Sequence, residues 1–304
     1  MPITPTKFIW MDGELVEWEK ATVHVLNHSL HYGSGLFEGI RAYHTKKGPA
    51  VFRLTPHIER LHRSAKIYLI DMPFGVEALV EATKDVVRSN ALDACYIRPL
   101  VYHGYGEMGL NPLASPVMVS IAAWSWGAYL GEESLVHGVR TKISSWRRND
   151  HNAIPPAAKA TGQYLNSGLA KVEAVKSGYD EAIMLNERGF IADATGENVF
   201  MVRDGILMTP PLASGPLGGI TREAIMIMAR DMGIQVEETD LSRTDLYTAD
   251  EAFMTGTAAE VVPIRSVDDR MLGDAGPTTK KIQEMFYASV RGEVEKYSDW
   301  NEYV

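Results

Sequence analysis

Hydrophobic and polar positions follow two different patterns along the first half of the chain. Short runs rich in β-branched and aromatic residues predict strands at residues 7–10, 39–43, 50–53, 94–101 and 117–123. Apolar residues that recur every three or four positions predict helices at residues 56–70 and 76–90. We expect Thr55 to cap the first of these helices, with Pro56 as an early helical residue. The first half therefore predicts a mixed α and β domain.

Residues 124–137 show no sustained periodicity, and we interpret them as the connection between two domains. Beyond them, strands are predicted at residues 139–145, 181–185, 199–203, 206–209 and 252–256. Helices are predicted at residues 162–176, 221–232 and 280–290. The alternation lacks the regular repeat of a βα barrel and favours an α+β or α/β fold in both halves. We expect a small domain over residues 1–123 and a larger one over 138–304.

Composition narrows the class of protein. The chain has 304 residues, 45% of them hydrophobic and 23% charged, and a net charge of -9. The acidic balance argues against broad electrostatic capture of nucleic acid or of an anionic membrane. No apolar run approaches the roughly 20 residues that span a bilayer, and the first ten residues lack the apolar core of a signal peptide. Cys95 is the single cysteine, so no disulfide forms within the chain. We expect a cytoplasmic enzyme without partners among nucleic acids or membranes.

Three local motifs carry little chemistry. Residues 104–109 match the dinucleotide-binding fingerprint, but Pro112 and Pro116 follow where that motif requires a helix, so a turn is the better interpretation. The histidines at positions 24–31 and 57–62 lack companion ligands at metal-site spacing, and no metal site is expected. Cys95 lies in an apolar strand pattern that favours a buried, inert thiol.

Lys159 stands in an unusual setting for a lysine. It lies between small residues and follows two prolines, Pro155 and Pro156. In a partly dry site the pKa of an ammonium group falls, and the free amine can then form a Schiff base. The segment is therefore a candidate site for covalent attachment of a carbonyl cofactor.

Asp193 precedes an apolar strand pattern that begins near Asn198. We expect this carboxylate to lie in a turn, where it would be able to pair with a protonated pyridine nitrogen. Glu197 is close enough in sequence to serve the same purpose. A polar hairpin without catalytic function is the alternative interpretation.

Two further segments are suited to binding anions. Gly218 and Gly219 precede Ile220 and Thr221 at the predicted start of a helix, where backbone N–H groups and the helix dipole favour a phosphate. The turn at residues 255–259 follows a predicted strand and offers hydroxyl and backbone donors. A plain helix start and a simple turn are the alternatives.

Together the four segments resemble the fold-type IV pyridoxal-phosphate enzymes and match their aminotransferase signature. The matching residues are Asp193, Thr195, Asn198, Val199, Phe200, Leu207, Thr209, Leu217, Gly219, Ile220 and Arg222. The family usually has Glu at the position of Asp193, so the shorter acid must reach the ring nitrogen differently or through water. Residues 30–41, 94–100 and 126–131 further resemble bacterial branched-chain amino-acid aminotransferases. The resemblance implies a small N-terminal and a larger C-terminal α/β domain with the active site between them.

The resemblance also implies the cofactor, pyridoxal 5'-phosphate, and its ligands. Lys159 would form the internal aldimine and shuttle a proton, Tyr164 would bond the phenolic oxygen, and Asp193 would keep the ring nitrogen protonated. The phosphate would be held by Arg60, Ile220, Thr221 and Thr257. The full set of implied cofactor-binding residues is Arg60, Lys159, Tyr164, Asp193, Leu217, Gly219, Ile220, Thr221, Gly256 and Thr257.

The implied reaction transfers the amino group of leucine, isoleucine or valine to 2-oxoglutarate. Arg98 would take the γ-carboxylate of glutamate. The α-carboxylate would be received by Tyr96, Gly256, Thr257 and Ala258. The full set of implied substrate-binding residues is Tyr32, Phe37, Gly39, Tyr96, Arg98, Leu110, Trp126, Tyr129, Thr257 and Ala258. In relatives, Tyr32 and Leu110 reach across from a neighbouring subunit, so a homodimer or hexamer is implied.

Rival functions use the same residues. A lyase of the same fold that acts on aminodeoxychorismate would share Lys159 and the phosphate ligands but eliminate pyruvate. An aminotransferase for D-amino acids or amines, and a protein that binds the cofactor without turnover, are further alternatives. Tyr96, Arg98 and the segment around Phe37 argue against the lyase.

Overall fold

The computed structural model describes residues 3–127 and 130–304. Contacts within the chain divide it into two compact units. Unit 1 comprises Met1–Trp126, Ala158–Gly162 and Ala288–Val304, and unit 2 comprises Gly127–Ala157 and Gln163–Tyr287. The sequence predicted two domains that are each continuous along the chain, and those domain boundaries stay a prediction. In the described residues no helix is both long and apolar enough to span a membrane.

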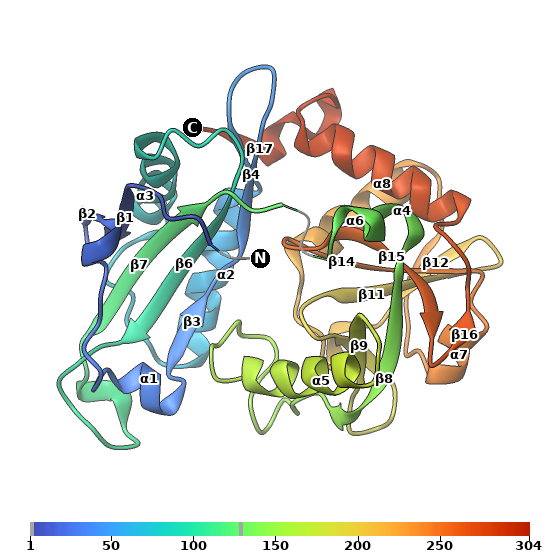
Figure 1. Ribbon diagram of the computed structural model, residues 1–304, viewed down its shortest axis with the longest axis horizontal. Helices are drawn as coiled ribbons and strands as arrows, with labels where there is room; N and C mark the ends of the chain where they lie inside the picture. The colour runs from blue at the N-terminus through green and yellow to red at the C-terminus, as the bar shows by residue number, and fades with distance from the viewer. Residues whose placement is uncertain (1–2, 128–129) are drawn as a thin grey trace. The chain divides into compact units, whose positions relative to one another are not determined.

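Unit 1 is built on an antiparallel sheet with the strand order β17-β5-β4-β6-β7-β1-β2, and β3 also pairs with β6 (Figure 1). The strands are β1 (Phe8–Met11), β2 (Glu14–Glu17), β3 (Gly35–Phe37), β4 (Ile40–Tyr43), β5 (Ala50–Phe52), β6 (Cys95–His103), β7 (Val117–Trp124) and β17 (Asn301–Tyr303). The α-helices are α1 (His28–Tyr32), α2 (Leu54–Ile67) and α3 (Val76–Ser89), and short 3-10 turns occur at Trp18–Lys20, Pro112–Ala114 and Glu295–Trp300.

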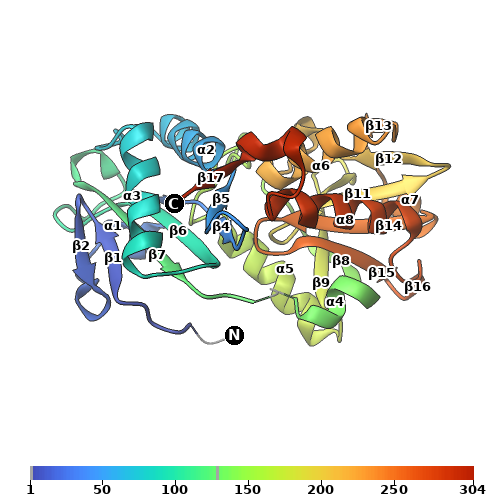
Figure 2. The same ribbon diagram turned by 90° about the horizontal axis from the view of Figure 1, so that it is seen from above.

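Helices α2 and α3 cover one face of this sheet (Figure 2). Their apolar residues repeat at helical spacing, and Ile58 and Leu61 of α2 pack with Ile97 and Ile121 of the sheet in one fully buried cluster. Burying one such side chain contributes roughly 1.5–3 kcal/mol relative to leaving it exposed. The hydrophobic period therefore fixes which side of α2 faces the sheet.

The start of α2 is held by a distant residue. Arg53 adopts a left-handed conformation (φ 52°) before the helix, and no side chain of the N-cap residue caps it. Glu302 of β17 instead accepts hydrogen bonds from the backbone N and the hydroxyl of Thr55, at 2.6 and 2.9 Å. The prediction of Thr55 as the cap is wrong, because Thr55 lies inside the first turn and donates both bonds.

Unit 2 is built on a mixed sheet with the strand order β10-β9-β8-β15-β14-β11-β12-β13, and β16 also pairs with β15. The strands are β8 (Val139–Arg147), β9 (Glu181–Leu185), β10 (Ile191–Ala194), β11 (Asn198–Arg203), β12 (Ile206–Thr209), β13 (Val236–Glu238), β14 (Glu251–Gly256), β15 (Glu260–Val267) and β16 (Arg270–Met271). The helices are α4 (Glu132–His137), α5 (Tyr164–Lys176), α6 (Ile220–Asp231), α7 (Arg243–Tyr247) and α8 (Pro277–Val290), with a 3-10 turn at Leu212–Ser214.

Strand β8 runs parallel to both β9 and β15, whereas β11, β14 and β15 form an antiparallel run. Val199, Met254 and Val262 belong to the buried core of this sheet. Phe200 and Phe253 stack with ring centroids 5.0 Å apart. These apolar strands explain why most predicted elements of the second half are confirmed, although the long strand β15 was not predicted.

Candidate active site

The segment that carries Lys159 is bound to unit 1 by backbone hydrogen bonds. The N–H of Phe37 donates to the carbonyl of Lys159 at 3.0 Å, and the N–H of Lys159 donates to the hydroxyl of Ser64 at 3.1 Å. Gly162 donates to Gly33 at 3.1 Å, and a Cβ on Gly33 would lie 2.8 Å from the Cα of Gly162. Close approach of two backbones therefore requires glycine at position 33 and holds the lysine segment in place.

Lys159 and Arg98 lie against the same aromatic ring. The Nζ of Lys159 is 5.0 Å from the ring centroid of Phe37, and the Cζ of Arg98 is 4.7 Å from it. Tyr96 and Arg98, two residues apart on β6, share one face of the strand, and Nη2 of Arg98 donates to the hydroxyl of Tyr96 at 3.1 Å. The structure thus brings together four residues that the sequence predicted for catalysis and substrate binding.

Arg98 is a cation without a carboxylate partner among the described residues. Its Nε is buried and has no hydrogen-bond partner there. Buried polar groups are normally satisfied, and an arginine in such a setting matches a planar anion from outside the protein. The predicted role of Arg98 as the ligand of a substrate carboxylate stays a prediction.

Aromatic residues surround Tyr96. Its ring contacts Trp124 and Trp126, with centroids 5.3 and 4.5 Å away, and Arg41 fixes Trp126 by donating to its carbonyl at 2.9 Å. A Cβ on Gly39 would lie 2.1 Å from the hydroxyl oxygen of Tyr96, so only glycine fits there. Gly39 therefore makes room for the tyrosine.

Arg60 forms a buried ion pair on the other side of the same segment. Its Nε and Nη2 donate to the two carboxylate oxygens of Glu38 at 2.8 and 2.7 Å, and Nδ1 of His57 lies 2.8 Å from Oε2 of Glu38. Burial would raise the pKa of Glu38, but the charge of Arg60 and the bonds from His57 and Arg60 outweigh it and hold that pKa well below its usual range. Sequence reasoning named Arg60 but missed Glu38.

Tyr32 and Leu110 are exposed, at 44% and 85% of their surface. The ring of Tyr32 contacts that of His28 on its own helix at a tilt of 46°, with centroids 4.7 Å apart. Tyr129, the remaining predicted substrate residue of this region, lies outside the described residues.

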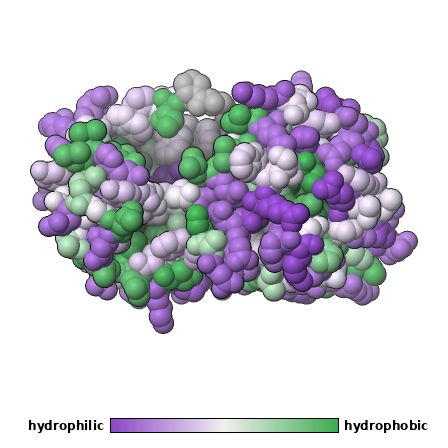
Figure 3. Space-filling model, turned by 90° about the horizontal axis from the view of Figure 1, so that it is seen from below, coloured by the Kyte–Doolittle hydropathy of each residue, from purple (hydrophilic) through white to green (hydrophobic). Residues whose placement is uncertain are grey.

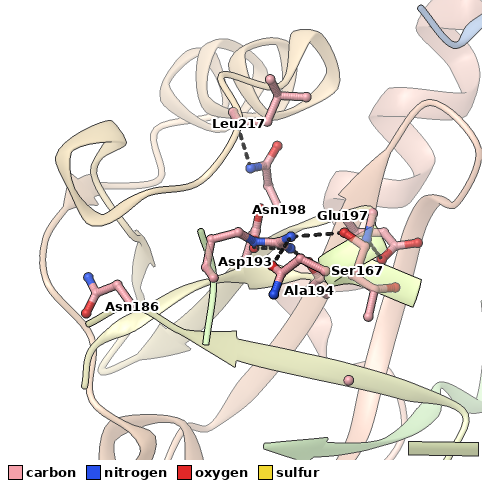
Figure 4. Close-up of polar contacts among 12 residues, drawn as sticks. Ser167, Asn186, Asp193, Ala194, Glu197, Asn198 and Leu217 are labelled. Atoms are coloured by element: carbon pink, nitrogen blue, oxygen red, sulfur yellow. Dashed lines mark hydrogen bonds and ion pairs between the residues drawn. The ribbon is translucent and has the colours of Figure 1, made fainter. Parts of the chain in front are cut away.

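In unit 2, Asp193 lies within strand β10, so the prediction that it occupies a turn is wrong. Pairing of β10 with β9 extends the strand through Ala194 and buries the carboxylate. Oδ1 of Asp193 accepts from Nε of Arg148 at 2.7 Å, and Nη1 of Arg148 donates to Ser167 at 2.9 Å. Figure 4 shows Asp193 and Ser167 on adjoining elements of this site. Sequence reasoning missed Arg148, which lies 45 positions from its partner.

Glu197 is buried near Asp193 but is electrostatically different. Burial, and next the charge of Glu181, raise the pKa of Glu197 to about 8. Glu181 itself is paired with Lys171 at 2.6 Å and accepts from the hydroxyl of Thr195 at 2.7 Å. At neutral pH Glu197 therefore holds its proton, whereas Asp193 is paired with a cation.

The predicted anion-binding segments of unit 2 meet at one end of its sheet. The start of β11 pairs with the end of β14, which sets Asn198 opposite Thr255. Nδ2 of Asn198 donates to the carbonyl of Leu217 at 2.9 Å (Figure 4). A Cβ on Gly219 would lie 2.0 Å from Oδ1 of Asn198, so a glycine is needed there. The loop before α6 is thereby tied to the strand ends.

The first turn of α6 begins at Ile220, and its N-cap residue, Gly219, has no side chain to cap it. The N–H groups of such a helix start, together with the buried Thr221, suit a phosphate. Strand β14 ends at Gly256 as expected, and Thr257 and Ala258 follow in a turn. Tyr164 begins α5, the helix that also carries Ser167.

Comparison with known proteins identifies the family. Residues 35–267 match the model of Amino-transferase class IV. The chain is 51% identical to the branched-chain-amino-acid aminotransferase of Escherichia coli (strain K12) over 296 residues, 96% of each chain. It is 47% identical to that of Pseudomonas aeruginosa (strain PAO1), covering 96% of this chain and 95% of the other.

Solved structures agree with this result. The crystal structure of the Escherichia coli branched-chain amino acid aminotransferase superposes with a TM-score of 0.96 at 50% identity, covering 98% of this chain and 99% of the other. That of the T.th. enzyme with pyridoxamine 5'-phosphate gives 0.96 at 47% identity, covering 99% of each. With the lysine, the acidic strand residue and the glycine-led helix start all present, this chain belongs to the class IV aminotransferases.

Proposed function

We propose that the protein is a pyridoxal 5'-phosphate-dependent aminotransferase that moves the amino group of leucine, isoleucine or valine onto 2-oxoglutarate by a ping-pong mechanism. Its family and the names of its relatives support the reaction class and the substrates. The structural observation that carries the proposal is the pair of cations at the Phe37 ring. Lys159 and Arg98 lie 5.0 and 4.7 Å from one ring, so a reactive amine and a carboxylate receptor serve the same small volume.

The residues present fit a phosphorylated pyridine cofactor. When bound, pyridoxal 5'-phosphate supplies an electron-accepting ring conjugated to the substrate nitrogen. Lys159 would attach it and move the proton at the substrate Cα, and Tyr164 would bond its phenolic oxygen. Asp193, held by Arg148, would keep the ring nitrogen protonated. The raised pKa of Glu197 supports Asp193 over Glu197 as that anion.

The phosphate would be bound by Arg60, Ile220, Thr221 and Thr257, with Leu217, Gly219 and Gly256 forming the surrounding backbone. The uncapped start of α6 supports this assignment, because its N–H groups favour an anion. The clash that any larger residue at position 219 would create with Asn198 supports it as well.

Two kinds of substrate side chain would use one pocket. The rings of Phe37 and Trp126 offer apolar walls for an aliphatic side chain, and Arg98 offers a cation for the γ-carboxylate of glutamate. Tyr96, Gly256, Thr257 and Ala258 would receive the α-carboxylate, with Gly39 leaving room for Tyr96. Tyr129 is included in this proposal from its position in the sequence alone.

We also propose that the enzyme acts as a homo-oligomer, a dimer or a hexamer. Leu30, Tyr32, Leu110 and Leu113 are all exposed on unit 1. Figure 3 shows hydrophobic side chains interspersed with polar ones on the face of the molecule that it draws. The open face of its sheet also bears an apolar hollow of about 350 Å³ lined by Ile9, Leu30 and Leu100, among others. A second copy of the chain would cover this surface. The cytoplasmic location stays a prediction.

The test is an absorbance spectrum of the purified protein with pyridoxal 5'-phosphate, before and after L-leucine and then 2-oxoglutarate. We expect a visible band that leucine removes and 2-oxoglutarate restores. Lys159→Ala should abolish the band, and the exposed Lys66→Ala should keep it. A band that leucine leaves unchanged would refute the branched-chain assignment, and release of pyruvate from aminodeoxychorismate would favour the lyase. A response to D-leucine alone would favour a D-amino-acid aminotransferase.

A further inference from the structure

We propose that Glu38, supported by His57, is a positioning residue that fixes the guanidinium group of Arg60 for binding the phosphate of the cofactor. This rests on the proposed function, in which Arg60 is a phosphate ligand. Glu38 would not touch the cofactor. It would act only through Arg60, by setting the direction in which that cation points.

The first support is the geometry of the ion pair. Both carboxylate oxygens of Glu38 bond one edge of the Arg60 guanidinium, through Nε at 2.8 Å and Nη2 at 2.7 Å. A guanidinium is planar, so fixing one edge fixes the orientation of the whole group. A long arginine side chain is thereby held in one conformation before any ligand arrives.

The second support is burial. Glu38 has no exposed surface, and His57 and Arg60 are 1% and 6% exposed. An ionised carboxylate accepts but does not donate, so Nδ1 of His57 donates its proton to Glu38. Burial lowers the pKa of His57 despite the nearby carboxylate, so His57 is a neutral donor at pH 7. The triad of Glu38, His57 and Arg60 therefore carries one negative and one positive charge, both buried and paired.

The third support is the place of Glu38 in the fold. It stands between Phe37 and Gly39, the two neighbours that face the candidate substrate residues, and its own side chain points to α2. His57, Arg60 and Ser64 follow one another at helical spacing on α2, and Ser64 accepts from the N–H of Lys159. One helix face thus carries both the Glu38 network and an anchor of the lysine segment.

The test compares the affinity of the protein for pyridoxal 5'-phosphate with its affinity for pyridoxal, which lacks the phosphate. Binding of each is followed by visible absorbance in wild type, Glu38→Gln and Arg60→Met. If Glu38 acts through Arg60, Glu38→Gln should weaken binding of the phosphorylated form about tenfold, as expected for a weakened charge-assisted bond. Its affinity for pyridoxal should change less than about twofold.

The matched control is Glu302→Gln, because Glu302 also bonds the start of α2 but does so through Thr55 instead of Arg60. It should lower the stability of unit 1 without changing the ratio of the two affinities. An equal loss for both forms in Glu38→Gln would show a merely structural role and overturn the proposal. If Arg60→Met changes the ratio and Glu38→Gln does not, the proposal falls while the proposed function stands.

Absence of binding in wild type would instead refute the proposed function. If Glu38→Gln fails to fold, the double variant Glu38→Gln/Arg60→Met can replace it, because that variant removes both buried charges. The variant His57→Gln tests the contribution of the hydrogen bond between His57 and Glu38. Once Arg60 is replaced, the further substitution of Glu38 should not lower the phosphate selectivity, which is the ratio of the affinities for pyridoxal 5'-phosphate and pyridoxal. In an otherwise unchanged chain, His57→Gln should lower this ratio about threefold or less. An additional loss of selectivity in the double variant, beyond that of Arg60→Met, would contradict the proposal.

Discussion

Units 1 and 2 each contain a buried pair of one arginine and one carboxylate, and the two pairs have opposite arrangements. In unit 1, both carboxylate oxygens of Glu38 accept hydrogen bonds from Arg60, and one of them also accepts a hydrogen bond from His57. In unit 2, Arg148 holds Asp193 and reaches Ser167 with another nitrogen. We propose the arginine as the ligand in unit 1 and the acid as the ligand in unit 2. A buried pair of arginine and carboxylate can therefore offer either its positive or its negative partner to a ligand. Which partner it offers depends on which of the two the rest of the protein holds in place.

The largest expected effect comes from the acid of unit 2. Asp193→Asn should slow the single-turnover half-reaction with L-leucine about 100- to 1000-fold, the loss typical of removing one preorganised electrostatic group. Folding should survive, because the amide oxygen still accepts from Arg148. Glu38→Gln, measured with saturating cofactor, should change this rate less than about threefold. If Glu197→Gln lowered the single-turnover rate and Asp193→Asn left it unchanged, Glu197 and not Asp193 would be the acid that pairs with the ring nitrogen.

A third arginine sharpens the comparison, since Arg98 has no carboxylate partner in the described residues. Arg98→Met should raise KM for 2-oxoglutarate about 30-fold or more, because losing one partner of a desolvated charge pair costs about 2 kcal/mol or more. The KM for leucine in the same variant is the control and should change less than about threefold. Equal losses for both substrates would mean that Arg98 supports packing rather than charge recognition.

The carboxyls of the two units should also respond oppositely to pH. The folded pKa of Glu38 is depressed, so its contribution to stability is full above its usual value of 4.5 and is lost as pH falls below it. The folded pKa of Glu197 is raised to about 8, so between pH 4.5 and about 8 its burial costs stability progressively as pH rises.

Glu197→Gln should therefore gain free energy of unfolding relative to wild type as pH rises through that window, by at most about 1.4 kcal/mol per pH unit. Glu38→Gln should be most destabilised near pH 7 and approach wild type at low pH. Urea unfolding between pH 2 and 9 measures both, because the contribution of Glu38 changes below pH 4.5 and that of Glu197 between pH 4.5 and about 8. Parallel pH profiles for the two variants would contradict the assigned directions.

The smallest effect is expected from Ser167→Ala. It removes one of the bonds that Arg148 makes and leaves its bond to Asp193 intact. Loss of about 1 kcal/mol in the free energy of unfolding is expected, with a change in single-turnover rate below about threefold. A rate as low as that of Asp193→Asn would show that the Ser167 contact itself orients the acid.

Local signals allowed much of the fold to be predicted. Strands β6, β7, β9, β11 and β12 carry clear apolar runs or alternation, and helices α2, α3, α6 and α8 carry a clear apolar period. These elements and α5 lie close to their predicted positions. Strand β15 was missed because Pro263 interrupts its sequence and Glu260 takes a positive φ of 61° at its start. Strand β2 is short and largely exposed, so its apolar pattern is weak.

Partners distant in sequence could not be predicted. Glu38 is 22 positions from Arg60, and Arg148 is 45 from Asp193. Nothing in the local sequence of either residue distinguishes a buried partner from a surface charge. Arg60 and Asp193 were predicted from the resemblance to the family. Their partners Glu38 and Arg148 could be identified only from the folded structure, because tertiary packing brings them together.

Strand β17 has a consequence for the folding of unit 1. It pairs Asn301 with Phe52, and Glu302 holds the first turn of α2, the helix that carries Arg60 and contacts the Lys159 segment. Thr55 and Glu302 are 247 positions apart, so their contact closes a very long loop of the chain. The entropy of closing such a loop must be lost before the contact stabilises the fold, so contacts of this kind slow folding. The start of α2 should therefore be among the last parts of unit 1 to become fixed.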